Sequence, residues 1–162
     1  MEQSPVFEVV VSGTHSLAIP EAIARPFYEK GMKRVLVEAR YGERSLRIHA
    51  ALNRWKNGTY SIMFSKNNQK KLGIFPNDYF QMQFFEDTSK YGVELPEEFE
   101  AVLFGDPEAH RIFEGFTPGK KRGIIYMIAK FKASQKRIDK TLLLCENLKR
   151  GLRDNKELLR PL

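Results

Sequence analysis

The hydrophobic pattern of this chain changes its period once, in the polar stretch Glu86–Gly92. Before this stretch apolar residues alternate with polar ones, as at Leu46 and Ile48, which is typical of half-buried β-strands. After it apolar residues recur every three or four positions, as in helices with one buried face. We therefore predict an α+β protein with a small β-barrel domain over residues 1–88 and an all-helical domain over residues 93–162.

Turn and cap signals divide the first half into short elements. Asn57-Gly58 is the strongest hairpin signal in the sequence, and Ser65 and Gly73 are suited to begin and end a short helix. The segments Ile19–Val37 and Phe64–Phe84 each show the pattern of a strand, a capped short helix, a glycine and a strand. Two such units joined by hairpins predict a barrel of the AbrB-like or double-psi type, whose closure removes exposed sheet edges.

Helix-start signals divide the second half into about four helices. Pro96 opens the first, and the pairs Asp106-Pro107 and Thr117-Pro118 each place a capping side chain before a proline at the first helical position. The single cysteine, Cys145, lies in the apolar stripe of the last long helix. This position predicts a buried, unreactive thiol.

The formal net charge of +7 is unevenly distributed. Residues 93–118 carry one basic and seven acidic side chains, whereas residues 119–162 carry 13 basic and four acidic ones. Either the two segments pair within the helical domain, or the basic segment binds an anionic partner such as nucleic acid. The predicted polyanion-binding residues are cations of the basic segment and two arginines near the hairpins: Lys120, Lys121, Lys130, Lys132, Lys136, Arg137, Lys140, Arg47 and Arg54.

Catalytic and metal-binding motifs are absent from the sequence, and no cofactor or metal is predicted. Asp106, His110 and Glu114 share one helical face, and we interpret them as a helix cap and a solvent-facing His/Glu pair. We favour a non-enzymatic binding protein. The alternative is an enzyme or small-molecule-binding protein with a site between barrel and helices that uses His49 or His110.

The N-terminal sequence lacks the features of a signal peptide, and no apolar stretch is long enough to span a membrane. A single cysteine also fits a reducing compartment. We therefore expect a cytoplasmic protein.

The second half carries the motifs of a known family. They are a leading helix over Leu95–Leu103, the segment Asp106–Pro118, a helix that ends in Ile125–Lys130 and the basic run Arg137–Lys140. This order resembles the C-terminal region of the YdeI/OmpD-associated, or bacteriocin-protection, family. One departure is Ser134-Gln135, where many members have a Thr-Arg pair.

The first half, with its LGIFPND turn before the last strand, resembles a domain of unknown function that is often fused in front of this region. The resemblance implies an architecture and not a chemistry, because no activity or ligand is established for the family. The family name implies a further alternative, a protein-interaction module in stress or envelope resistance.

Overall fold

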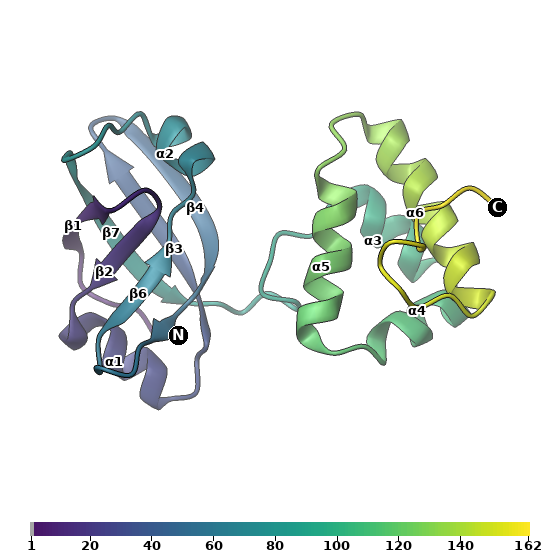
Figure 1. Ribbon diagram of the computed structural model, residues 1–162, viewed down its shortest axis with the longest axis horizontal. Coiled ribbons are helices and arrows are strands. Elements are labelled where there is room, and N and C mark those ends of the chain that lie inside the picture. The colour runs from purple at the N-terminus through teal and green to yellow at the C-terminus, as the bar shows by residue number, and fades with distance from the viewer. Residues whose placement is uncertain (1) are drawn as a thin grey trace. The chain divides into compact units, whose positions relative to one another are not determined.

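The computed structural model describes residues 2–162, which fall into two compact units, Met1–Gly92 and Val93–Leu162 (Figure 1). We call the first the β unit, because it is a sheet with two short helices. We call the second the helical unit, because its regular elements are all helices. The predicted α+β class is thus confirmed.

The β unit is built on one antiparallel sheet with the strand order β4-β3-β7-β1-β2-β6-β5. Its elements in chain order are β1 (Phe7–Ser12), β2 (Ser16–Ile19), α1 (Glu21–Glu29), β3 (Arg34–Tyr41), β4 (Arg44–Ala51), β5 (Asn53–Arg54), β6 (Tyr60–Met63), α2 (Lys66–Leu72) and β7 (Tyr79–Glu86).

The ends of this sheet approach each other. Only Leu52 separates β4 from β5 in the chain, yet these strands lie at opposite ends of the strand order. The sheet therefore curls into a half-barrel. The strand order does not confirm the predicted AbrB-like or double-psi type. β2 precedes α1 and pairs with β1 and β6, whereas β3 follows α1 and pairs with β4 and β7. The strands that flank each short helix are thus not neighbours.

Aromatic residues fill the inside of the half-barrel. The Phe84 ring is fully buried, with the rings of Phe7 and Phe27 packed edge-on at centroid distances of 5.3 and 5.8 Å. Phe27 comes from the buried face of α1, so this helix closes one side of the core. Apolar burial of this kind is the main source of stability in a small domain.

Short-range signals in the β unit behave as predicted. The Ser65 hydroxyl accepts a hydrogen bond from the Asn68 amide at 3.1 Å, and Gly73 ends α2 in the left-handed region with φ +80°. Asn57-Gly58 turns the chain between β5 and β6, and the Trp55 amide donates to the Thr59 carbonyl across this turn at 2.9 Å. Each of these caps and turns depends on residues only a few positions apart in the chain.

The polar stretch Glu86–Gly92, where the hydrophobic pattern changes, is held to the β unit by hydrogen bonds. The Asp87 carboxylate contacts His49 Nδ1 at 2.7 Å and accepts from the Ser89 amide at 2.9 Å. Burial alone would raise the pKa of Asp87, but the bonds from Ser89 and His49 together lower it. Arg34 Nε donates to the Gly92 carbonyl at 2.9 Å. His49 is therefore part of a structural contact.

The helical unit contains α3 (Glu97–Phe104), α4 (Pro107–Glu114), α5 (Pro118–Ala129) and α6 (Ser134–Lys149). The Asp106 and Thr117 side chains cap α4 and α5 by accepting bonds from Ala109 and Lys120 amides. Cys145 is buried, and this burial is the main reason that its pKa rises to about 11. Within residues 2–162 no helix combines the length and apolar character that crossing a membrane requires.

Ion pairs join the acidic and basic segments of the helical unit. Arg137 Nη2 lies 2.7 Å from Glu98 Oε2, and Lys149 Nζ lies 2.8 Å from Asp106 Oδ2. A third pair joins Lys121 to Glu114 at 3.5 Å. The uneven charge distribution of the sequence thus has a structural explanation inside this unit.

The Glu98–Arg137 pair makes stability depend on pH. Hydrogen bonds from Arg137, and then from Ser134, lower the pKa of Glu98 from 4.5 to about 2. A lowered folded-state pKa contributes stability above the unfolded value, and this is lost as the pH falls through the folded value. We expect Glu98→Gln to lower the melting temperature at neutral pH, and the difference from wild type to shrink between about pH 5 and about pH 2. Thermal unfolding monitored by circular dichroism tests this.

The matched control is Glu97→Gln, which removes the same charge from the exposed neighbouring position. A pH dependence equal for the Glu98 and Glu97 variants would show that the Arg137 contact does not stabilise the carboxylate.

Candidate functional site

Most of the predicted polyanion-binding cations have partners within the protein. Lys120 donates to the Asn155 side chain at 3.0 Å, and Arg137 is held by the Glu98 carboxylate and by the carbonyls of Phe131 and Lys132. Lys140 Nζ lies 5.8 Å from the centre of the Phe131 ring. A cation held in this way would have to give up existing contacts to bind a phosphate.

The other predicted cations divide into two groups. Lys130, Lys132 and Lys136 are exposed around the connection between α5 and α6. Arg47 and Arg54 belong to the β unit, where Arg47 lies 3.5 Å from Glu38 and Arg54 is exposed on β5.

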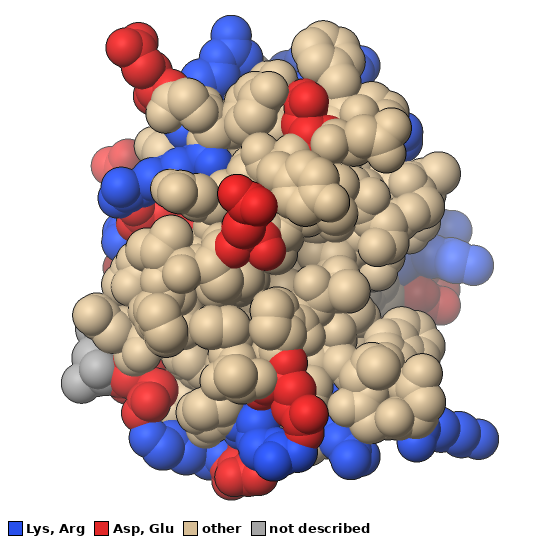
Figure 2. All heavy atoms as spheres, turned by 90° about the vertical axis from the view of Figure 1, so that its left-hand side faces the viewer, with Lys and Arg blue, Asp and Glu red and all other residues tan. Residues whose placement is uncertain are grey.

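A broad face of the β unit is largely uncharged. In Figure 2 uncharged residues dominate the centre of this face, and most Lys and Arg side chains lie toward its margins. The strand register also places Val10 and Tyr79 opposite each other, and Ser16 opposite Met63, on the outer side of the sheet. Among the described residues on the face that Figure 2 shows, Lys and Arg side chains form no track across the centre.

The Asp106, His110 and Glu114 group is structural. Asp106 caps α4 and pairs with Lys149, while His110 stacks on Phe104 at a centroid distance of 4.3 Å. His110 Nε2 lies 3.2 Å from a Glu114 oxygen. Within residues 2–162 no group of three or more His, Cys, Asp or Glu side chains is arranged to hold a metal ion.

The strongest candidate site is a pocket of about 680 Å³ in the β unit, between the β3–β4 turn and the end of α2. This volume lies in the range of small-molecule sites, about 300–1,000 Å³. Its lining residues are Tyr41, Gly42, Glu43, Arg44, Lys70, Leu72, Gly73, Ile74 and Phe75.

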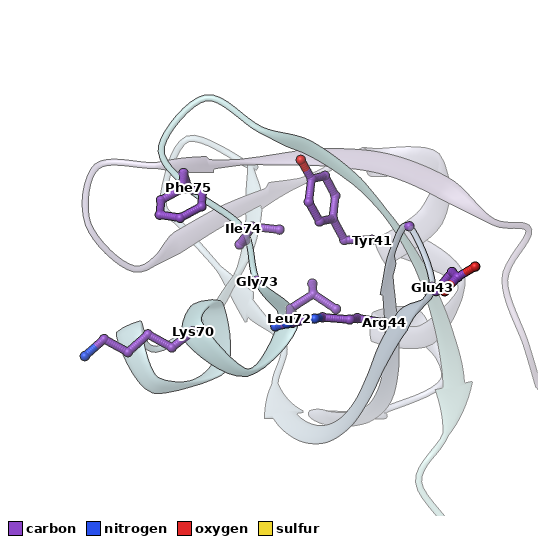
Figure 3. A pocket seen from close by; sticks show the side chains of 9 residues that line it. Tyr41, Glu43, Arg44, Lys70, Leu72, Gly73, Ile74 and Phe75 are labelled. Carbon is purple, nitrogen blue, oxygen red and sulfur yellow. The ribbon is translucent and has the colours of Figure 1, made fainter.

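The pocket has an apolar wall and one inward-pointing cation. Leu72, Ile74, Phe75 and the Tyr41 ring surround the hollow, and the Arg44 guanidinium enters it from one side (Figure 3). The charged ends of Glu43 and Lys70 point away from it (Figure 3). The pocket thus combines apolar surface with a single positive group.

Gly73 determines where the Arg44 side chain lies. A Cβ atom at Gly73 would come within 2.9 Å of Arg44 Nη1, so the missing side chain lets the guanidinium rest against the end of α2. Leu72 and Ile74 on either side of the glycine are buried. The residue that ends the helix therefore also makes room for the cation.

The turn beside the pocket is held by Asp78. Its carboxylate accepts a hydrogen bond from the Phe75 amide at 2.7 Å. The same carboxylate is the main reason that the pKa of Tyr41 is raised, with burial and a hydrogen bond between the two groups adding to the effect. Phe75 is 75% exposed and Asn77 has φ +72°, so a fixed turn presents an aromatic ring at the rim.

Sequence reasoning missed this site. The charges near the hairpins do not distinguish Arg44 from Arg47, and the Gly73 signal indicates only a helix end. The pocket forms because the half-barrel brings the β3–β4 turn against α2, a long-range contact that no local pattern encodes.

The fold and pocket define a two-unit α+β protein with a ligand-sized pocket in its half-barrel. Residues 92–151 match the model of the family described as "Bacteriocin-protection, YdeI or OmpD-Associated". Residues 92–151 are therefore similar to this family, which confirms the resemblance over the stretch that carries it.

Comparisons with whole proteins add little. No curated protein matches the chain. Among solved structures, the solution structure of PHS018 from Pyrococcus horikoshii is similar at 20% identity and a TM-score of 0.39, over 53% of this chain and 94% of that chain.

Proposed function

We propose that this protein is a binding protein whose β-unit pocket takes a ligand with an apolar body and one anionic group. The observation that carries the proposal is Arg44. Its guanidinium points into an apolar-walled pocket, and among residues 2–162 no carboxylate pairs with it. A guanidinium at such a wall favours a carboxylate, sulfonate or phosphate, which it binds through two parallel hydrogen bonds.

The apolar wall supplies the other half of the recognition. Leu72 and Ile74 are already buried, whereas Phe75 presents most of its ring, so an apolar ligand body would remove mainly the surface of this ring from water. A ligand of this pocket therefore needs both an apolar body and an anionic group. Nucleic acid is the weaker proposal, because several of the cations expected to contact phosphates already have partners.

The test uses two dyes that differ by one charge. 1-Anilinonaphthalene-8-sulfonate has an apolar ring system and a sulfonate, and N-phenyl-1-naphthylamine has the same ring system without the sulfonate. We expect Arg44→Gln to weaken sulfonate binding at least about tenfold, because a charge-assisted hydrogen bond is lost. Binding of the neutral dye should stay the same within about twofold. Fluorescence titration measures both affinities.

The matched control is Arg40→Gln, which removes an exposed arginine that pairs with Glu38 outside the pocket. Equal loss of sulfonate binding in the Arg40 and Arg44 variants would indicate a diffuse charge effect. Unchanged sulfonate binding in Arg44→Gln would disprove the role of the pocket.

A further inference from the structure

The apolar surface that a ligand of the pocket can reach is mostly aromatic. Leu72 and Ile74 line the pocket, but they are only 0% and 6% exposed, so little of their surface is left to contact. Phe75 is largely exposed at the rim, and Tyr41 is partly exposed. The two rings therefore supply most of the apolar contact that the pocket offers.

The two rings lie on the same side of the hollow. In Figure 3 Tyr41 and Phe75 lie on either side of Ile74 in the upper part of the view, and the Arg44 guanidinium lies below it. A ligand whose anionic group pairs with Arg44 would therefore extend its body toward the rings.

One carboxylate connects the two aromatic residues. The Asp78 carboxylate accepts a hydrogen bond from the Phe75 amide at 2.7 Å and interacts with the Tyr41 hydroxyl. The buried part of Tyr41 packs against the core of the half-barrel. Both residues are thus held before a ligand arrives, so that binding costs little of their conformational freedom.

Aromatic rings discriminate between ligand bodies of the same size. Two aromatic rings that stack or meet edge-on gain more than the burial of their area alone supplies. A saturated body of the same carbon skeleton gains only the burial. Contact with Phe75 and Tyr41 therefore favours a flat aromatic body over an aliphatic one.

We infer that the pocket selects aromatic anions, of which aryl carboxylates are the simplest class, and that Phe75 determines this selectivity. The inference rests on the proposed function, because it names the class of ligand for the same pocket. The Arg44 guanidinium pairs with the anionic group, and the rings of Phe75 and Tyr41 contact the flat body.

The probes are 2-naphthoate and decahydro-2-naphthoate, its fully saturated analogue, which are both ionised at neutral pH. The saturated acid is the more apolar of the two, so burial alone would favour it. We expect the wild-type protein to bind 2-naphthoate about tenfold more tightly instead, because only this acid has aromatic contacts with the rings. Isothermal titration calorimetry measures both affinities.

The matched variants are Phe75→Leu and Tyr126→Leu. Leucine keeps an apolar side chain at the rim but removes the ring, so we expect Phe75→Leu to weaken 2-naphthoate binding about fivefold. Binding of the saturated acid should stay the same within about twofold. Tyr126→Leu removes an exposed ring from α5 of the helical unit and should change neither affinity.

The outcomes separate this inference from the pocket proposal. Equal or tighter binding of the saturated acid by wild type, or a Phe75→Leu variant that keeps the wild-type ratio of the two affinities, would overturn the selectivity for aromatic anions. The pocket proposal would still stand if Arg44→Gln weakened the binding of both acids. If neither acid bound, or if Arg44→Gln left both affinities unchanged, the pocket proposal would be overturned as well.

Discussion

Replacing Phe84 by alanine is expected to lower the free energy of unfolding of the β unit by about 3–5 kcal/mol. The Phe84 ring is completely buried, and two further phenylalanine rings pack edge-on against it. Its removal leaves a cavity at a place where strands and α1 meet, and a close-packed core collapses only partly around such a cavity. The ladder of β7 does not depend on this ring, so the loss should come from packing.

Urea titration followed by tryptophan fluorescence measures this effect, because Trp55 is the single tryptophan of the chain and lies in the β unit. Phe75→Ala is the control, since the Phe75 ring is 75% exposed and its loss should cost less than about 0.5 kcal/mol. Equal effects of the two substitutions would contradict the placement of Phe84 at the centre of the core.

Asn147→Ala is expected to destabilise the helical unit by about 2–3 kcal/mol and to release the C-terminal segment. The Asn147 side chain is 1% exposed and donates from Nδ2 to the carbonyls of Leu158 and Arg160, at 2.9 and 3.0 Å. Without it those carbonyls lose their donor, and the fully buried Leu158 is no longer held in place. The cost is large because these polar groups are sheltered from water.

Limited trypsin digestion checks the second result, because Arg153 and Lys156 provide exposed cleavage sites in this segment. The variant should be cut there well before wild type. Gln135→Ala removes an exposed amide from the same helix and should leave the digestion pattern unchanged. Identical digestion of wild type and Asn147→Ala would show that the segment is held by other contacts.

The features that could be predicted from sequence are the ones with short-range causes. The caps at Ser65, Asp106 and Thr117 each depend on a bond to an amide three residues later. The change of period at Glu86–Gly92 separates strands from helices for the same reason, because periodicity reflects local geometry. These elements agree with the structure.

The features that could not be predicted depend on distant residues. The sequence pattern predicts Arg137 as a solvent-facing cation. In the structure it pairs with Glu98, which lies 39 positions away in the chain. The strand order also joins segments from opposite ends of the β unit, such as β1 and β7. The pocket also depends on distant residues, since Arg44 lines it only because the fold places the end of α2 beside this arginine.

The central claim is that the β-unit pocket binds an apolar anion through Arg44. Nuclear magnetic resonance tests it most directly, with 1-anilinonaphthalene-8-sulfonate added to isotopically labelled protein. The account predicts contacts between the dye protons and the ring protons of Phe75, and amide shifts concentrated at Gly42, Arg44 and Gly73. Dye contacts located elsewhere, for instance on the uncharged outer side of the sheet, would contradict it.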